Sequence, residues 1–347
     1  GDNKMKAIVI NKHGGPEVLS YEEVETPVLG PRDVLINIKA IGVNHFDLDV
    51  RNGISGHLDS QMPHVLGVEG AGIITEVGSA VTAFKPGERV MPYLTTSCGH
   101  CYRCLSGHDN ICMHFDKLGV THWGTYAEYV RVTDDNIVRM PDELSFIDAA
   151  ATQVAVATAW ELVVVHANVQ PGEAVLINAA GSGVGTAAVQ LAANAGGMVI
   201  STAGSDEKLA RAKELGSSYG INYNKESIEE GVMRVTGGRG VEVCIEMVGG
   251  NVLQESIRAL NHNGRLATCG AHAGEHVEID IIEIFRKQIH ISGNHFSPKI
   301  NNEKALRLVA SGKVKPVIAK TFHLSQMSEA HKLIESRNFF GKVVLET

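Results

Sequence analysis

Short apolar runs separated by glycine and proline fill the first part of the chain, from Lys6 to about Ala150. The runs are strand-like, and Gly14-Gly15-Pro16 and Lys85-Pro86-Gly87 are typical turn signals between them. No long helical period interrupts the series. The pattern predicts a mostly β, barrel-like domain over residues 1–150, with strands at 7–10, 33–40, 72–77, 89–92 and 126–132.

The pattern changes near Ala149, where strand-like and helix-like segments begin to alternate. An alanine-rich stretch over 149–166 suits a helix, and Pro171-Gly172-Glu173 leads into the alternation. Repeated β-α units build a parallel sheet with helices on both faces, which predicts an α/β fold with a second domain over 151–295. Strands are expected at 174–178, 198–202, 220–222, 241–246, 265–268 and 289–292, and helices at 184–195, 206–215, 228–235 and 252–260.

The last segment, 296–347, ends in an isolated apolar strand at 341–345. We expect this strand to return to the first domain and to complete it.

Composition and charge narrow the classes of function. The chain has 347 residues, of which 44% are hydrophobic and 20% charged, which suits two globular domains. A net charge of −8 offers no basic face for nucleic acid or an anionic membrane surface. No apolar run is long enough to span a bilayer, and the N-terminus lacks a signal-peptide pattern. We therefore expect a cytoplasmic protein that acts on a small molecule.

A glycine-rich turn follows the first strand of the second domain. The strand at 174–178 is followed by Ala179-Ala180-Gly181-Ser182-Gly183-Val184-Gly185 and then by a helix, the order that a dinucleotide-binding fold requires. Small residues let the backbone approach a pyrophosphate, and the helix N-terminus stabilises its charge. The alternative is an ordinary tight turn. The cofactor candidates here are Ala180, Ser182, Gly183, Val184 and Gly185.

The end of the second strand bears on the choice of dinucleotide. An acidic residue there would bind the ribose 2′-hydroxyl of NAD, but this sequence has Ala203. Ser205, Lys208 and Tyr223 are candidates near the adenosine ribose, and a lysine beside a small strand end suits a 2′-phosphate. NADPH is therefore favoured. The alternative is that Lys208 lies on a solvated helix face and that Asp206 or Glu207 binds the ribose.

Four of the six cysteines lie within one segment, at Cys98, Cys101, Cys104 and Cys112. This spacing can wrap the backbone around a tetrahedral zinc ion, and four sulfur ligands leave no open position for water. Such a site stabilises a loop and does no chemistry. Two disulfides suit a cytosolic protein poorly, and a nucleic-acid-binding zinc ribbon suits the acidic charge poorly. We expect one structural zinc per chain.

Together these motifs resemble the medium-chain dehydrogenase/reductase superfamily, which includes zinc alcohol dehydrogenases and quinone oxidoreductases. The resemblance covers essentially the whole chain. The resemblance implies a GroES-like β-barrel catalytic domain, a Rossmann doubly wound parallel sheet, and an active site in the cleft between them. Its further motifs are Gly15-Pro16-Glu17-Val18-Leu19, Gly42-Val43-Asn44, Gly67-Val68-Glu69-Gly70-Ala71-Gly72, Gly87-Glu88-Arg89-Val90 and Gly341-Lys342-Val343-Val344.

The family's catalytic zinc ligands are missing from this sequence. Alcohol dehydrogenases of the family use a cysteine after Gly-Val, a histidine in Gly-His-Glu and a third Cys or Asp. Here the first two places hold Asn44 and Val68, and no cysteine lies between Met113 and Val243. Asp148 is the nearest acid, and one carboxylate alone cannot hold the ion. The alternative is a rearranged metal site built from His45, Asp47, His64 or Glu69.

Without a catalytic metal, reduction of a conjugated carbonyl is easier than reduction of an ordinary ketone. Hydride can add to the β-carbon, and hydrogen-bond donors can support the enolate charge. The resemblance implies reduction of quinones, enones or enoyl compounds with NADPH. It places Asn44 beside the substrate carbonyl and Thr158 near the nicotinamide, while His45, Asp47 or solvent supplies the proton. Cofactor contacts are implied for Gly270, Ala271, Asn294 and Lys342.

Two other functions stay open. One is a zinc-type alcohol dehydrogenase acting on alcohols or ketones, and the other is a non-catalytic NADPH-binding protein. The family's first two dinucleotide glycines fall on Ala180 and Ser182, which are small enough for phosphate binding to survive. The resemblance also implies a homodimer or homotetramer, in which the apolar strand near 289–293 pairs across a two-fold axis.

Overall fold

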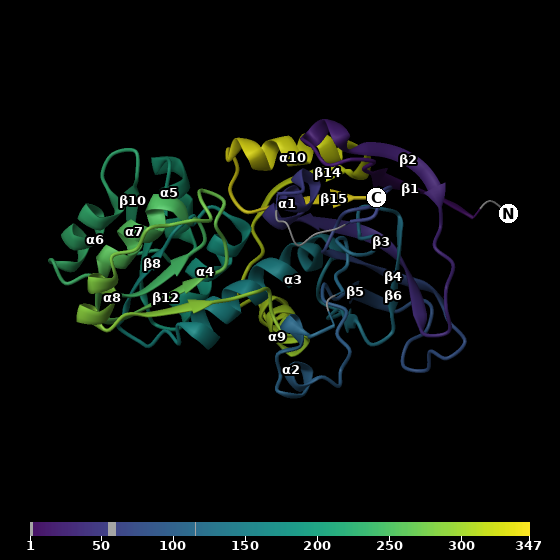
Figure 1. Ribbon diagram of the computed structural model, residues 1–347, viewed down its shortest axis with the longest axis horizontal. Helices are drawn as coiled ribbons and strands as arrows, with labels where there is room; N and C mark the ends of the chain where they lie inside the picture. The colour runs from purple at the N-terminus through teal and green to yellow at the C-terminus, as the bar shows by residue number, and fades with distance from the viewer. Residues whose placement is uncertain (1–2, 55–59, 115) are drawn as a thin grey trace. The chain divides into compact units, whose positions relative to one another are not determined.

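The computed structural model describes residues 3–54, 60–114 and 116–347, and it divides the chain into two compact units (Figure 1). The first unit comprises residues 1–154, 298–310 and 316–347. The second comprises residues 155–297 and 311–315.

The first unit is built on a mostly antiparallel seven-stranded sheet with the order β14-β15-β3-β4-β5-β7, in which β6 pairs with β3. Strands β1 and β2 form a separate antiparallel pair. The predicted return of the C-terminal strand is confirmed, because β15 pairs with β3. The strands are β1 Lys4–Val9, β2 Ser20–Glu25, β3 Asp33–Val43, β4 Gly70–Val77, β5 Arg89–Pro92, β6 Tyr129–Thr133, β7 Ile137–Arg139, β14 Ile318–His323 and β15 Lys342–Glu346.

The second unit contains a six-stranded sheet with the order β10-β9-β8-β11-β12-β13, in which every described pairing is parallel. Helices follow the strands and pack against them, so the predicted alternation is confirmed (Figure 1). The elements are β8 Ala174–Ile177, α4 Gly183–Asn194, β9 Met198–Ala203, α5 Asp206–Glu214, β10 Tyr219–Asn222, α6 Ile228–Thr236, β11 Val241–Glu246, α7 Gly250–Ala259, β12 Leu260–Thr268, α8 Ile281–Lys287 and β13 His290–Gly293.

Several short helices were not expected from the sequence. They are α1 His45–Asn52, α2 Tyr102–Leu105, α8 and α10 Met327–Ser336. The buried face of α1 includes Asp47 and Arg51, so no apolar stripe marks it as a helix. The C-terminal segment also contains the helix α9 Lys299–Ala310, before β14.

The alanine-rich stretch begins earlier than predicted, as α3 Phe146–Trp160, and continues in a π-helical turn, Glu161–His166. By length and composition this stretch could cross a membrane. Most of it is buried inside the protein, as in the core helix of a globular protein.

Candidate functional site

Asn44 lies between the end of β3 and the start of α1, and two charged groups hold its side-chain amide. Its Oδ1 atom accepts a hydrogen bond from Nζ of Lys342 at 2.8 Å, and its Nδ2 atom donates to Oε1 of Glu69 at 3.1 Å. An ammonium group only donates and a carboxylate only accepts, so these partners fix which end of the amide is oxygen. The described residues use one Nδ2–H bond, which leaves the second as a donor for a ligand.

Lys342 and Glu69 form an ion pair in the interior of the first unit. Their Nζ and Oε1 atoms lie 2.9 Å apart, and the side chains are 5% and 0% exposed. The ammonium also donates to the carbonyl of Val43 at 3.1 Å, and Oε2 of Glu69 accepts the backbone N–H of Val154 at 2.6 Å. All three N–H bonds of Lys342 thus have acceptors. A direct contact with the cofactor would break one of them, and that predicted role stays a prediction.

Asp47 is fully buried in the first turn of α1, next to this group. Its Oδ2 atom accepts the backbone N–H of Asn44 at 3.0 Å. Burial raises the pKa of Asp47 to about 7, while the Asn44 N–H, the Tyr126 hydroxyl and Lys342 lower it. An acid with this pKa can hold or release a proton near neutral pH. His45, the other predicted proton carrier, is exposed, and its Nε2 atom lies 3.8 Å from Asp49.

The alternative metal ligands are placed in separate roles. His64 is buried, and its Nε2 atom lies 2.9 Å from the carbonyl oxygen of Gly119. Glu69 is held by Lys342, and Asp47 is held by the N-terminus of α1. Over the described ranges, the groups of His, Cys, Asp and Glu whose ligand atoms converge lie in the cysteine segment instead.

The glycine-rich turn joins β8 to α4. The Ser182 hydroxyl accepts the Gly185 N–H at 2.9 Å and donates to the carbonyl of Ala179 at 2.9 Å, so it caps the helix. A Cβ atom on Gly185 would lie only 2.1 Å from the Ala179 oxygen, which explains the glycine there. Ala180 is buried, whereas Ser182, Gly183 and Val184 are half-buried at the helix N-terminus. This cradle of small residues fits a dinucleotide phosphate.

Several buried polar side chains near this turn were not predicted from the sequence. Asn178, directly after β8, donates to Ser256 at 2.8 Å and accepts from Thr202 at 3.0 Å. Glu246, at the end of β11, accepts the backbone N–H groups of Val248 and Gly249 at 2.8 and 2.9 Å. Burial raises the pKa of Glu246. These side chains follow strand ends, which is the only sequence signal that marks them.

The acid next to the end of β9 is already paired. Oδ1 of Asp206 accepts from Asn222 at 3.0 Å, and Oδ2 accepts from Nζ of Lys225 at 2.5 Å. Ser205 caps α5 by accepting the Lys208 N–H at 3.2 Å. Lys208 is half-buried, and burial lowers its pKa. Sequence reasoning missed Lys225, which is 66% exposed and lies on the same loop as the half-exposed Tyr223.

The remaining predicted cofactor residues lie in the second unit. Thr158 is buried on α3. Gly270 and Ala271 follow β12, and a Cβ atom on Gly270 would lie 2.5 Å from the carbonyl of Met247. Asn294 follows β13, and its Oδ1 atom lies 3.2 Å from Nε2 of His166, a partner that the sequence did not reveal. Such positions at the carboxyl ends of parallel strands suit ligand binding.

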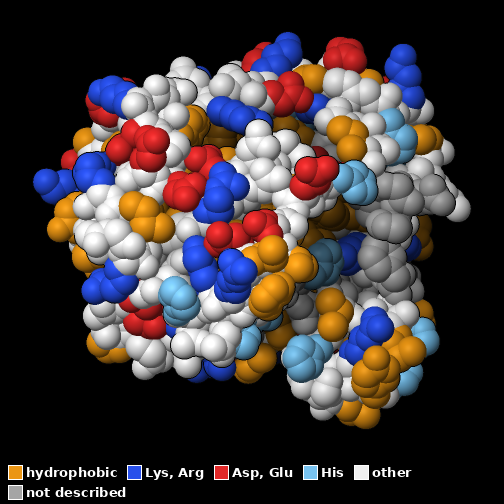
Figure 2. All heavy atoms as spheres, turned by 60° about the vertical axis from the view of Figure 1, so that its left-hand side comes forward, with side chains coloured by type: hydrophobic (Ala, Val, Ile, Leu, Met, Phe, Trp, Pro, Cys, Tyr) orange, Lys and Arg blue, Asp and Glu red, His pale blue; other side chains and the backbone are white. Residues whose placement is uncertain are grey.

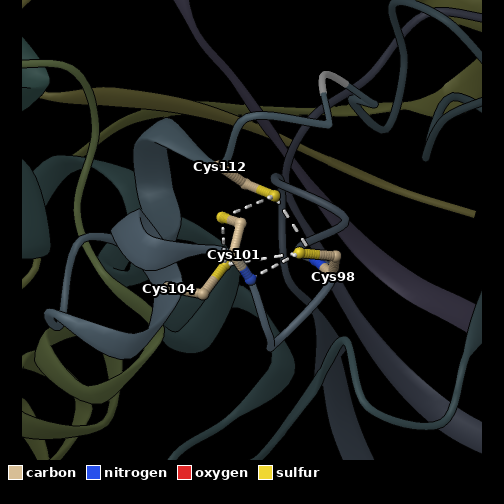
Figure 3. Close-up of side chains that lie close together, drawn as sticks. All are labelled: Cys98, Cys101, Cys104 and Cys112. Atoms are coloured by element: carbon tan, nitrogen blue, oxygen red, sulfur yellow. Dashed lines mark hydrogen bonds between the residues drawn. The ribbon is translucent and has the colours of Figure 1, made fainter.

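The four clustered cysteines point toward one another (Figure 3). The Sγ atoms of Cys101 and Cys104 lie 3.5 Å apart, those of Cys101 and Cys112 3.9 Å, and those of Cys98 and Cys104 4.0 Å. A tetrahedral zinc site with bonds of about 2.3 Å has sulfurs about 3.8 Å apart. Backbone N–H groups of Cys98 and Cys101 donate to sulfur as well. The four thiols are free and fit a structural zinc ion.

Acidic and basic side chains are interspersed on the face drawn in Figure 2, and hydrophobic side chains interrupt them. Part of the exposed apolar surface belongs to α8 and β13, the strand that ends the parallel sheet. Ile281, Ile282, Phe285 and Ile291 are 64%, 44%, 63% and 42% exposed. Exposed apolar side chains on and beside the edge strand of a sheet are typical of a contact surface.

Two family models match most of the chain. A family model described as "Alcohol dehydrogenase GroES-like domain" matches residues 30–142, and one described as "Zinc-binding dehydrogenase" matches residues 183–311. The first unit therefore contains a GroES-like domain and the second a Rossmann-like sheet, as predicted from the sequence.

Curated relatives of similar identity carry different names. An "Alcohol dehydrogenase" of Geobacillus stearothermophilus is 33% identical over 99% of both chains. A "Quinone oxidoreductase" of Sus scrofa is 31% identical over 99% of this chain and 98% of its own. A solved structure of an "NAD-dependent alcohol dehydrogenase" is 40% identical, with a TM-score of 0.93, and covers 99% of this chain and 100% of its own.

Proposed function

Because the chain belongs to the medium-chain dehydrogenase/reductase superfamily and is an oxidoreductase of its alcohol dehydrogenase and quinone oxidoreductase group, we propose that it reduces activated double bonds with NADPH. Quinones, enones and enoyl compounds are the proposed substrate classes. The proposal excludes a catalytic zinc.

The observation that carries this proposal is how the side-chain amide of Asn44 is held. It occupies the place of the first metal ligand, and its amide is held between Lys342 and Glu69 at 2.8 and 3.1 Å. Val68 occupies the place of the histidine ligand and is buried. An amide fixed in this way supplies a hydrogen-bond donor where a zinc enzyme would supply a Lewis acid.

The chemistry follows from that donor. NADPH held at the turn from Ala179 to Gly185 would supply a hydride to the β-carbon of the conjugated substrate, and negative charge would then develop on the carbonyl oxygen. The free N–H of Asn44 donates to this oxygen and stabilises its charge. A proton from Asp47 or from solvent then completes the reduction. Asp47 suits this step because its pKa is about 7.

The preference for NADPH is supported by the end of β9. Ala203 is buried there and has no carboxylate to bind a ribose 2′-hydroxyl. The carboxylate of Asp206 is already hydrogen-bonded to Asn222 and Lys225. Lys208, half-buried in the first turn of α5, would supply positive charge for a 2′-phosphate, whereas Lys225 is paired with Asp206. The name of the 40% identical structure includes NAD, which makes a direct comparison of both cofactors necessary.

The other parts of the proposal concern zinc and assembly. Cys98, Cys101, Cys104 and Cys112 would hold one structural zinc ion. The exposed side chains of α8 and β13 support a homodimer or homotetramer, because pairing across β13 would cover them. Light scattering that gives a monomer at micromolar concentration would contradict the assembly.

A substrate panel separates the proposal from its alternatives. NADPH oxidation should be fast with a quinone or an enone and slow with a saturated ketone. It should also survive a mild chelator that leaves the four-cysteine zinc in place. The alcohol dehydrogenase alternative, favoured by the 33% identical relative, predicts a fast ketone reaction that chelation abolishes and zinc restores. A non-catalytic protein would bind NADPH without oxidising it.

A further inference from the structure

Four polar side chains lie in a row inside the first unit, although each is at most 1% exposed. Asp47 and Arg51 come from α1, Tyr126 precedes β6, and His331 comes from α10. Buried polar groups are costly unless they are hydrogen-bonded, so a row of four in an apolar interior needs a reason.

The contacts between them are short. Nη1 of Arg51 lies 2.9 Å from Nδ1 of His331, and Nε2 of His331 lies 2.9 Å from the hydroxyl of Tyr126. The Tyr126 hydroxyl lies near enough to the Asp47 carboxylate to lower the pKa of that carboxyl. At the other end, a second nitrogen of Arg51 pairs with Glu335, which is 40% exposed.

The donor and acceptor properties of these groups fix the direction of each hydrogen bond in the row. A guanidinium has no acceptor, so Nδ1 of His331 must accept and its proton must sit on Nε2. Burial and Arg51 lower the pKa of His331 to about 3, so the ring is neutral near pH 7. Nε2–H then donates to Tyr126, which leaves the tyrosine hydroxyl proton to point toward Asp47.

The carboxylate at the end needs this donor. Oδ2 of Asp47 already accepts the Asn44 N–H, whereas Oδ1 is buried and makes no hydrogen bond among the described residues. The other charged groups that face Asp47 are Lys342, which favours the carboxylate, and Glu69, which opposes it. Tyr126 is thus a second neutral donor, besides the Asn44 N–H, that favours the ionised form.

We infer that Arg51, His331 and Tyr126 are positioning residues that form a one-directional chain of hydrogen bonds, whose last proton, on the Tyr126 hydroxyl, is directed at the unpartnered Oδ1 atom of Asp47. The chain aims a donor at the carboxylate and, through Asp47, holds the backbone of Asn44 at the start of α1. It connects the proposed catalytic loop to Glu335, the partly exposed partner of Arg51. The inference rests on the proposed function only for the role of Asn44 toward substrate.

Carbon-13 NMR titration of the Asp47 carboxyl in the free protein tests the chain without turnover. Tyr126→Phe removes the last donor and should raise the pKa of Asp47 by roughly one pH unit. His331→Gln should keep the wild-type value, because its amide oxygen accepts from Arg51 and its amide nitrogen donates to Tyr126. His331→Leu breaks the direction and should resemble Tyr126→Phe. Tyr21→Phe is the matched control, because Tyr21 is exposed and takes no part in these hydrogen bonds.

An unchanged Asp47 pKa in Tyr126→Phe would overturn the inference, as would equal values in the Gln and Leu variants. If His331→Leu does not fold, the Tyr126→Phe result alone decides, since it removes one oxygen atom and keeps the ring. The pH profile of enone reduction is a second readout, and its high-pH limb, where Asp47 loses the proton that it would donate, should move with the titrated pKa. If the wild-type protein reduces no enone, the proposed function fails, but the NMR titration of Asp47 still tests the hydrogen-bond chain.

Discussion

The Nζ atom of Lys342 lies 2.9 Å from Oε1 of Glu69, and both side chains are almost completely buried. Removing one partner of such a pair leaves an uncompensated charge in the interior. Lys342→Met should therefore lower the free energy of unfolding by about 3–5 kcal/mol. Urea denaturation followed by circular dichroism measures this loss.

The double variant Lys342→Met with Glu69→Gln is the control. It removes both charges, so we expect it to regain part of the stability that the single variant loses. A double variant as unstable as the sum of the two single variants would show that the pair is not coupled.

Asn44→Ala removes the proposed donor to the substrate oxygen. Turnover of an enone should fall by about 10²–10³-fold, the usual cost of losing one donor to a developing oxyanion. The affinity for NADPH should change little, because the change is confined to the loop before α1. Steady-state kinetics and a fluorescence titration with NADPH measure the two effects. Similar losses in turnover and in cofactor affinity would argue against the role.

The architecture could be predicted from the sequence because its signals are local. The alternation of strands and helices, the turn from Ala179 to Gly185 and the cysteines from Cys98 to Cys112 each lie within one short segment. Their residues are neighbours in space because they are neighbours in the chain. The same holds for the helix caps Ser182 and Ser205.

The interior of the site could not be predicted in this way. Lys342 is 273 residues from Glu69 and 298 from Asn44, so no spacing rule connects them. His331 was missed for a related reason: it is a buried polar residue on α10, a helix that was not predicted from the sequence. Long-range pairing and buried polar contacts appear only once the fold brings the segments together.

The proposed cofactor preference depends on positive charge near the end of β9. Lys208→Ala should weaken NADPH binding about tenfold and leave NADH binding nearly unchanged, because only NADPH carries the 2′-phosphate. Lys213→Ala, at an exposed lysine near the end of the same helix, should affect neither. Calorimetric titrations with both nucleotides give the comparison. Equal affinities for NADPH and NADH in the wild-type protein would exclude the preference.

The proposed zinc site should matter for stability and not for chemistry. Cys104→Ser removes one of four thiolate ligands, so the protein should lose its zinc and melt at a lower temperature. Ser106→Ala on the same segment keeps the ligands and should retain one zinc per chain. Metal analysis and thermal denaturation distinguish the variants. Wild-type protein purified with two tightly bound zinc ions, or with none, would contradict the proposal.

The raised pKa of Asp47 predicts how the unfolding free energy changes with pH. Its pKa is about 7 in the folded protein, above its ordinary value of 3.8, because burial penalises the charged form. Between these two values the folded state binds more protons than the unfolded state, so this group lowers the stability progressively as the pH rises from about 4 to 7. Asp47→Asn cannot ionise, and its amide oxygen can still accept the Asn44 N–H. The variant should therefore show a flatter dependence of the unfolding free energy on pH across that interval, measured by urea denaturation at several pH values. Equal slopes in wild type and variant would show that Asp47 titrates near its ordinary pKa, and would remove it as a proton source near neutral pH.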